Sequence, residues 1–356
     1  MSMDNDHIKH TGSGDPEPTA LAHTLLEHFT ANWKTQVIYV AAELRIADLL
    51  AEEAKTSEEL AALTDTHEPS LRRLLRALGT LDICRELEPG RFAITPMGSL
   101  LGTAAPGSLR AWSIWWGGYL WDVWGKLLYS VKTGESGRKL LSGLDGFGHL
   151  EQDPAAAAIF NQGLLELTRL TAEGVVGAYD FSGLKRIVDV GGGYGALLAA
   201  ILRANPAATG VLFDLSHATA GGRRHFEEAG LASRCEFLAG NFFESVPGGA
   251  DAYVLKSVIH DWDDEKSLQI LENCRHAMGE DGRLLLVERV LPDRLEVSEE
   301  HQAAARSDLS MLVALAAHER TESQFLALLQ SAGLRVARIL PVGMTVSVIE
   351  AFPARR

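Results

Sequence analysis

A cluster of glycines behind an acidic residue is the first feature of the chain that could do chemistry. Gly191, Gly193 and Gly195 form a G-x-G-x-G motif. Adding Ala196 also satisfies the dinucleotide pattern G-x-G-x-x-G/A. The motif follows an apolar stretch typical of a strand and precedes a predicted helix, so a ligand could approach the backbone there. A tight turn without a ligand is the alternative.

Two acidic residues indicate which nucleoside this loop would hold. Asp214 lies 23 residues after Gly191, at the end of the next predicted strand, where a carboxylate can accept from both ribose hydroxyls. Asp189 precedes the glycines and suits a cationic ligand better than a pyrophosphate. Between residues 189 and 203 the only basic side chain is Arg203. The pattern favours S-adenosylmethionine over NAD.

A third loop is expected at the same edge of the sheet. Gly240, Asn241 and Phe242 follow a predicted strand at residues 236–238. Phe242 could cover an adenine face and Asn241 could bind its edge, whereas a plain turn with buried phenylalanines is the alternative. The loop extends the candidate nucleoside site.

A histidine follows the predicted strand at residues 252–255. His260 has an ordinary pKa of about 6.5 and could take a proton near neutral pH, although a lone histidine is often structural. Asp263 is a suitable N-cap for the next helix, with Asp264 in its first turn. We expect no metal site, because acids this close in sequence diverge around a helix start.

Alternating strands and helices must position these residues. Strands are expected at residues 186–190, 210–214, 236–238, 252–255, 284–287, 336–340 and 346–351. Their alternation with helices predicts an α/β fold with a Rossmann-like, doubly wound, mostly parallel sheet that has helices on both faces.

The region before this sheet has two helical parts. Residues 19–103 predict a mostly α, winged-helix-like domain, with a capping box at Thr56 and Glu59. Arginines 72, 73 and 76 raise a DNA-binding alternative, but the abundant glutamates favour a dimerisation module. Residues 104–180 predict a helical bridge. Five of the seven tryptophans lie at residues 112–124, where they form a core or line a pocket for a planar ligand.

Composition sets limits on the function. The 356 residues are 46% hydrophobic and 22% charged, typical of about two globular domains. The net charge of −14 disfavours nucleic acid and anionic membranes as partners. Three widely spaced cysteines indicate neither disulfides nor a zinc cluster. Residues 1–18 are expected to be a disordered tail without a signal sequence, and we expect a cytoplasmic protein that does not span a membrane.

From about Ala20 to Phe352 the chain resembles the plant-type class I S-adenosylmethionine-dependent small-molecule O-methyltransferases, including bacterial natural-product members. The matching segments are DVGGGYGALL at 189–198, VLFDL at 211–215, GNFF at 240–243, LKSVIHDWDDE at 255–265, LLLVERVLP at 284–292 and ERTESQFLALLQSAGL at 319–334. The resemblance implies a homodimer, with residues 104–356 as the methyltransferase domain and residues 181–356 as its cofactor-binding core.

The resemblance also implies roles for individual residues. His260 is expected to be the general base, held by Glu288 and Glu319, and the acceptor is expected to be an aromatic or polyketide-like hydroxyl compound. The candidate cofactor residues are Asp189, Gly191, Gly193, Asp214, Leu215, Gly240, Asn241, Phe242, Lys256, Ser257, Asp261 and Trp262. The candidate acceptor residues are Trp112, Trp116, Phe160, Asn161, Leu164, Met311 and Leu312.

Two departures from the family pattern stand out. Asn241 replaces the usual acid, and Ala316-Ala317-His318 replaces Gly-Gly before a basic residue. Transfer to nitrogen or carbon remains an alternative within the family. A winged-helix regulator that binds the nucleoside without turnover is the alternative from another class.

Overall fold

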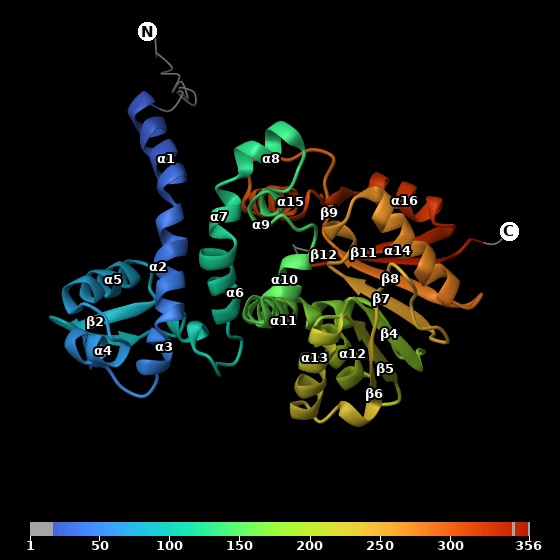
Figure 1. Ribbon diagram of the computed structural model, residues 1–356, viewed down its shortest axis with the longest axis horizontal. Helices are drawn as coiled ribbons and strands as arrows, with labels where there is room; N and C mark the ends of the chain where they lie inside the picture. The colour runs from blue at the N-terminus through green and yellow to red at the C-terminus, as the bar shows by residue number, and fades with distance from the viewer. Residues whose placement is uncertain (1–16, 344–345, 355–356) are drawn as a thin grey trace, which may run out of the picture.

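The computed structural model describes residues 17–343 and 346–354. A helical N-terminal part is followed by a run of short helices and by a large sheet covered with helices (Figure 1). The expected tail lies outside the described residues except at its end, where Pro18 begins helix α1.

The large sheet has seven strands in the order β11-β12-β8-β7-β4-β5-β6. The strands from β8 to β6 pair in parallel, and β12 is antiparallel to both of its neighbours. This confirms the predicted mostly parallel α/β sheet. The strands are β4 (Arg186–Val190), β5 (Thr209–Asp214), β6 (Cys235–Ala239), β7 (Ala252–Lys256), β8 (Arg283–Glu288), β11 (Leu334–Val342) and β12 (Val346–Pro353).

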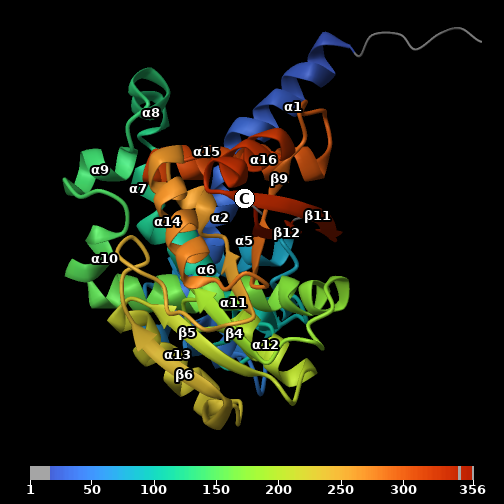
Figure 2. The same ribbon diagram turned by 90° about the vertical axis from the view of Figure 1, so that its right-hand side faces the viewer.

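Helices cover both faces of this sheet because its strands are apolar on both sides. In β8, Leu284 and Leu286 pack with α14 (Asp264–Ala277) and α16 (Glu322–Ser331). Leu285 and Val287, which alternate with them, belong to the opposite layer. That layer contains α11 (Pro154–Ala178), α12 (Ala196–Ala204) and α13 (Ser216–Glu228), as Figure 2 shows from the side. Because the strands from β8 to β6 are parallel, their carboxyl ends lie at the same edge of the sheet.

The N-terminal part has its own core. It contains α1 (Pro18–Thr30), α2 (Asn32–Glu43), α3 (Ile46–Leu49), α4 (Ser57–Thr64), α5 (Glu68–Thr80) and a small sheet of β1 (Lys55–Thr56), β3 (Arg91–Ile94) and β2 (Cys84–Glu88). The predicted capping box is present, since Thr56 and Glu59 each bind the other's backbone N–H. Arg72 and Arg76 each lie 3.8 Å from Glu86, so these arginines face an acidic side chain.

Short helices connect the two parts: the 3-10 helix η1 (Gly98–Leu101), α6 (Arg110–Ile114), the π-helix η2 (Trp115–Tyr119), α7 (Trp121–Trp124), α8 (Leu127–Thr133), α9 (Gly137–Ser142) and α10 (Gly148–Gln152). A Cβ at Gly117 would lie 2.1 Å from Tyr39 Cβ, so only glycine lets α2 approach η2 this closely. Buried Glu166 of α11 accepts from the backbone N–H groups of Ala111 and Trp112. These two hydrogen bonds fix the first turn of α6 against α11.

The remaining elements lie around the sheet edge: the 3-10 helices η3 (Ala232–Arg234) and η4 (Ile259–Asp261), the paired strands β9 (Val290–Leu291) and β10 (Arg320–Thr321), and α15 (Glu299–Leu315). Among the described residues, no helix combines the length and apolarity needed to cross a bilayer.

Helix α1 buries none of its residues. Leu21, Leu25 and Phe29 follow one another at intervals of four and form one apolar face, with exposed fractions of 54%, 63% and 66%. The helix projects from the rest of the protein (Figure 1). An apolar face of this kind marks an association surface, in agreement with the expected dimer.

We predict that the double variant Leu25→Glu, Phe29→Glu weakens self-association, because two charges would be desolvated in the interface. Light scattering after size exclusion should show a dimer for the wild type and a smaller species for the variant. Arg73→Glu on the exposed side of α5 is the control and should remain dimeric. A wild-type monomer, or a fully dimeric double variant, would contradict the prediction.

Candidate functional site

The glycine loop after β4 adopts a conformation that demands glycine. Gly191, Gly193 and Gly195 have φ angles of +69°, +59° and +77°. A Cβ at Gly191 would lie 2.9 Å from Val258 Cγ2, and one at Gly192 would lie 2.6 Å from the Asp189 carboxylate. Side chains at these two positions would collide with Val258 and Asp189, so bare glycine backbone lines the cavity here.

Asp214 connects the end of β5 to this loop. Its Oδ2 accepts from the Gly193 N–H at 2.7 Å, and its Oδ1 accepts from the Leu215 N–H at 2.6 Å. Burial raises the pKa of Asp214, while these two hydrogen bonds oppose the rise. Each oxygen retains acceptor capacity for a ligand hydroxyl.

Asp189 lies beneath the loop with an unsatisfied oxygen. The residue is 2% exposed, and its Oδ1 has no hydrogen-bond partner among the described residues. Burial and the nearby Asp214 raise the pKa of Asp189 to about 7. Desolvation lowers the pKa of Lys256, which reaches Ser257 Oγ at 3.2 Å. An orphaned buried carboxylate is the kind of group that a cationic ligand satisfies.

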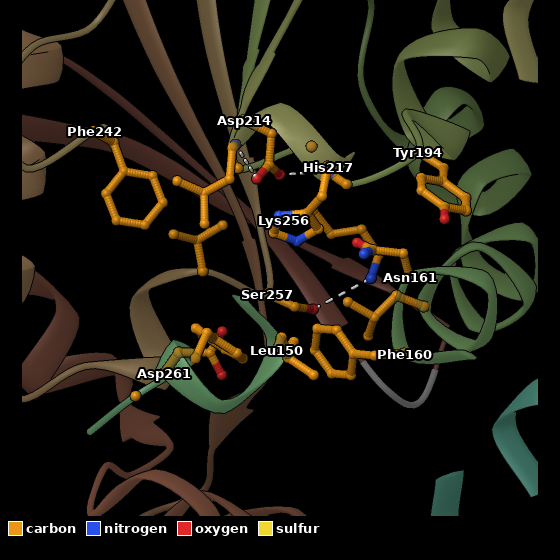
Figure 3. A pocket seen from close by; sticks show the side chains of 18 of the residues that line it. Leu150, Phe160, Asn161, Tyr194, Asp214, His217, Phe242, Lys256, Ser257 and Asp261 are labelled. Atoms are coloured by element: carbon orange, nitrogen blue, oxygen red, sulfur yellow. Dashed lines mark hydrogen bonds between the residues drawn. The ribbon is translucent and has the colours of Figure 1, made fainter. Parts of the chain in front are cut away.

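These residues line one cavity of about 470 Å³. Figure 3 shows Asp214 and Phe242 on one side and Leu150 and Phe160 on the other. All the residues predicted to bind the cofactor line it: Asp189, Gly191, Gly193, Asp214, Leu215, Gly240, Asn241, Phe242, Lys256, Ser257, Asp261 and Trp262. The side-chain oxygen Oδ1 of Asn241 already accepts from the Phe243 N–H at 3.0 Å, and it can accept one more hydrogen bond.

The predicted acceptor residues separate into two groups. Phe160, Asn161 and Leu164 of α11 line the cavity, whereas Trp112, Trp116, Met311 and Leu312 are not part of its lining. Trp112 packs against Gly163, where a Cβ would lie 3.1 Å from its ring, and Trp116 stacks on Trp124 at 5.9 Å. Contact of these four residues with an acceptor stays a prediction.

Part of the cavity wall was missing from the sequence-based prediction. Phe147, Leu150 and Glu151 come from α10 and the turn before it, Tyr194 comes from the glycine loop, and His217 comes from the first turn of α13. The proximity of Tyr194 to the glycines and of His217 to Asp214 in the sequence could have revealed these two residues. The α10 segment has no recognisable motif of its own.

His260 lies in η4, just after β7. Its Nδ1 is 3.1 Å from Glu319 Oε1 and 3.7 Å from Glu288 Oε2, and its Nε2 is 3.5 Å from Asp261 Oδ1. The structure thus brings together the three predicted catalytic residues. Because the shortest contact of the ring, 3.1 Å to Glu319, is made by Nδ1, we assign the proton of the neutral ring to Nδ1, and Nε2, beside Asp261, is then the basic atom.

Both glutamates are themselves held in place. Glu288 is fully buried, and its Oε1 accepts from the backbone N–H groups of Val258 and Ile259 at 2.9 and 2.8 Å. Glu319 Oε1 also accepts from Ser307 Oγ at 2.6 Å. These bonds fix the carboxylates before any ligand binds.

Arg320 is a positioning residue that the sequence reasoning missed. The side chain is fully buried, and it donates to the backbone carbonyls of Ile259 at 2.8 Å and Trp262 at 2.9 Å, and to Asp264 Oδ1 at 2.7 Å. It therefore holds the backbone on both sides of His260. Its place directly after Glu319 is the sequence signal that could have revealed it.

The charges around His260 change its acidity. Burial lowers its pKa, but Glu319, Glu288 and Asp261 outweigh burial and raise the pKa to about 10. The same burial raises the pKa of Asp261 to about 7 and that of Glu288 above its usual range. The ligand-free site favours an imidazolium, which is the form that a base takes after it has accepted a proton.

Comparisons with known proteins agree with this geometry. A family model described as an O-methyltransferase domain matches residues 124–335, and one described as an O-methyltransferase dimerisation domain matches residues 26–104. Phenazine O-methyltransferase PhzM of Lysobacter antibioticus is 43% identical over 94% of this chain and 96% of the relative. Phenazine-1-carboxylate N-methyltransferase of Pseudomonas aeruginosa is 31% identical over 93% and 97%.

Solved structures show the same fold over most of the chain. The crystal structure of LaPhzM superposes with a TM-score of 0.91 at 42% identity and covers 94% of this chain and 99% of that one. Human N-acetylserotonin methyltransferase, solved in complex with S-adenosylmethionine, gives 0.86 at 26% identity over 97% and 100%. With the family models matching both parts, the chain belongs to the O-methyltransferase family.

Proposed function

We propose that this chain transfers the methyl group of S-adenosylmethionine to a hydroxyl group of an aromatic small molecule, with His260 as general base. The observation that carries this proposal is the position of His260, which is held by two anchored glutamates beside the glycine-loop cavity. Family membership supports the reaction class, and relatives that methylate such compounds support the acceptor class.

The residues of the cavity fit the methyl donor. The backbone of Gly191 and Gly193 leaves the space for a nucleoside, and Asp214 offers two oxygens to its ribose hydroxyls. The unsatisfied Oδ1 of Asp189 suits the positive charge of the same molecule. Phe242 and Asn241 both line the cavity, and in our proposal Phe242 covers the adenine and Asn241 binds its edge.

When bound, the donor supplies an already activated methyl group, so the chain's main tasks are alignment and removal of a proton. In our proposal His260 Nε2 accepts the proton of the acceptor hydroxyl. Glu319 receives the hydrogen bond from Nδ1 and stabilises the imidazolium that results, and Glu288 adds a second negative charge.

The raised pKa of His260 keeps the ligand-free imidazole protonated at neutral pH, so the imidazole must lose this proton before it can act as a base. A phenol has a pKa of about 10, close to the value of about 10 for His260 in the ligand-free protein. Proton transfer between groups of equal pKa is nearly balanced in free energy. Positive charge in the adjacent cavity would disfavour the imidazolium and free Nε2 to accept the proton.

Methyl transfer to nitrogen is a second candidate, because the N-methyltransferase relative aligns over nearly the whole chain. The direct test incubates the enzyme with labelled methyl donor and a panel of phenols and matched aromatic amines. Methylated phenols support the proposal, and products restricted to amines replace it with the second candidate. Addition of EDTA should leave the rate unchanged; a loss would indicate a metal on His260, Glu288 and Glu319, whose ligand atoms lie within 4.8 Å of one another.

We predict that Asp214→Ala lowers the affinity for S-adenosylhomocysteine by about 1–3 kcal/mol, the scale of hydrogen bonds to a charged group. Isothermal calorimetry measures the change. Glu236→Ala removes an exposed carboxylate from the neighbouring strand β6 and serves as the control. Equal affinities in wild type and Asp214→Ala would argue against this carboxylate as the ribose ligand.

His260→Ala should lower kcat by about 10²- to 10⁴-fold, the usual contribution of a general base. Affinity for S-adenosylhomocysteine should hardly change, because His260 lies beside the cavity lining rather than in it. Steady-state kinetics and calorimetry separate the two effects, and His276→Ala on the exposed side of α14 is the control. Full turnover by His260→Ala on a phenol would mean that alignment alone is sufficient.

Glu319→Gln should move the pH profile of kcat to lower pH. The substitution removes the nearest negative charge from His260, so the pKa of the imidazole falls. Because the rate rises as the base loses its proton, its rising limb shifts in the acidic direction, while the maximum rate declines. Glu322→Gln, an exposed change in the same segment, should keep the wild-type profile. A shift to higher pH would contradict the assigned interaction.

A further inference from the structure

A buried guanidinium without a partner lies in the aromatic region beside the cavity. Arg138 of α9 is 6% exposed, and its Nε and Nη2 atoms are buried without a hydrogen-bond partner among the described residues. Burial alone lowers its pKa to about 10, and no charged group contributes to the shift. The arginine therefore remains charged at neutral pH and lacks a counter-ion within the described part of the chain.

The surroundings of Arg138 add further unused donors. The guanidinium carbon lies 5.3 Å from the centre of the Trp115 ring, and the His149 ring lies 6.3 Å from the same tryptophan. The Nε1 of Trp124 is buried without a hydrogen-bond partner among the described residues, and the His149 ring is buried beside the backbone of Gly146. Burial and the charge of Arg138 lower the pKa of His149 to about 4, so its ring is neutral and donates one N–H.

This arrangement is unfavourable unless an anion completes it. An unpaired buried charge and unsatisfied buried donors each carry a large desolvation cost. The unmet atoms of Arg138 are both donors. A carboxylate could satisfy them with its two oxygens, while the aromatic ring that carries it packs against Phe160 on the cavity side.

The cluster shares a wall with the proposed catalytic site. The Trp115 ring packs on Phe160 at 4.8 Å, and Phe160 and Leu150 line the cavity and belong to the same apolar cluster as Trp115. The cluster around Arg138 thus begins one side chain away from the cavity.

Helix α15 connects the two ends of this region. Ser136, at the start of α9, donates to the backbone carbonyls of Val313 and Ala314, while Ser307 holds Glu319 beside His260. Ser307 and Val313 are about 9 Å apart along the helix axis at 1.5 Å per residue. Helix α15 therefore positions both Glu319 and the start of α9.

We propose that the methyl acceptor carries a carboxylate, which binds to the Arg138 guanidinium beside His149, with its ring against Phe160 and its hydroxyl at His260. A carboxylate matches the two-pronged geometry of arginine. The inference rests on the proposed function, because it specifies the acceptor class of that same site.

The test compares two probes of equal shape, 6-hydroxy-2-naphthoate and its uncharged amide, in which the hydroxyl lies at the opposite end from the carbonyl group. Calorimetry is performed on the full-length protein saturated with S-adenosylhomocysteine. The wild type should bind the acid about 10- to 100-fold more tightly than the amide, the range for hydrogen bonds to a charged group. Arg138→Met should lose this preference and keep the affinity for the amide. Arg138→Lys should retain part of the preference.

Lys139→Met removes an exposed charge from the next position of α9 and should keep the wild-type preference. Arg138→Met should not lower the melting temperature, because it removes an unpaired buried charge. Three results would overturn the inference: no preference for the acid in the wild type, including failure of both probes to bind; an unchanged preference in Arg138→Met; or dissociation of the dimer in that variant, which would assign the counter-ion to a partner subunit. Failure of S-adenosylhomocysteine itself to bind would instead reject the proposed function.

Discussion

The hydrogen bond between His260 and Glu319 joins segments that are 59 residues apart in the chain. The imidazole lies among three carboxylates, with Glu319 and Glu288 at Nδ1 and Asp261 3.5 Å from Nε2. Buried carboxylates are costly unless they are hydrogen-bonded, so the surrounding structure must supply their partners. The segments around His260 supply these hydrogen-bond partners.

Strand β8, helix α15 and Arg320 each contribute hydrogen bonds that hold this site. Strand β8 ends in Glu288, whose carboxylate binds the first backbone N–H groups after β7 and so sets the start of η4. Helix α15 provides Ser307 to Glu319. Arg320 holds the carbonyls of η4 through a buried guanidinium that Asp264 neutralises. This arginine shows how the protein satisfies a buried cation with its own groups, in contrast to Arg138.

Local signals were sufficient for much of the fold. The alternation of apolar stretches predicted the strands, and the glycine loop predicted a positive-φ turn after β4. The predicted cofactor residues line one cavity because carboxyl ends of parallel strands meet at one edge. Features that depend on contacts between distant segments left no pattern in the sequence. The bonds from Arg320 to the backbone around His260 depend on tertiary packing. So do the contacts of Trp112 with Gly163 of α11 and of Trp116 with Trp124 of α7, which keep both rings out of the cavity lining.

The unsatisfied carboxylate of Asp189 links occupancy of the cavity by a cation to proton release. With a pKa of about 7, this group is about half protonated in the ligand-free protein at neutral pH. A positively charged ligand beside it favours the ionised form, so its binding releases a proton. Affinity for a cation is then fully developed above neutral pH and declines as the pH falls through 7. The cavity thereby exchanges a proton for a cation, and its occupancy by the cation decreases as the surroundings become more acidic.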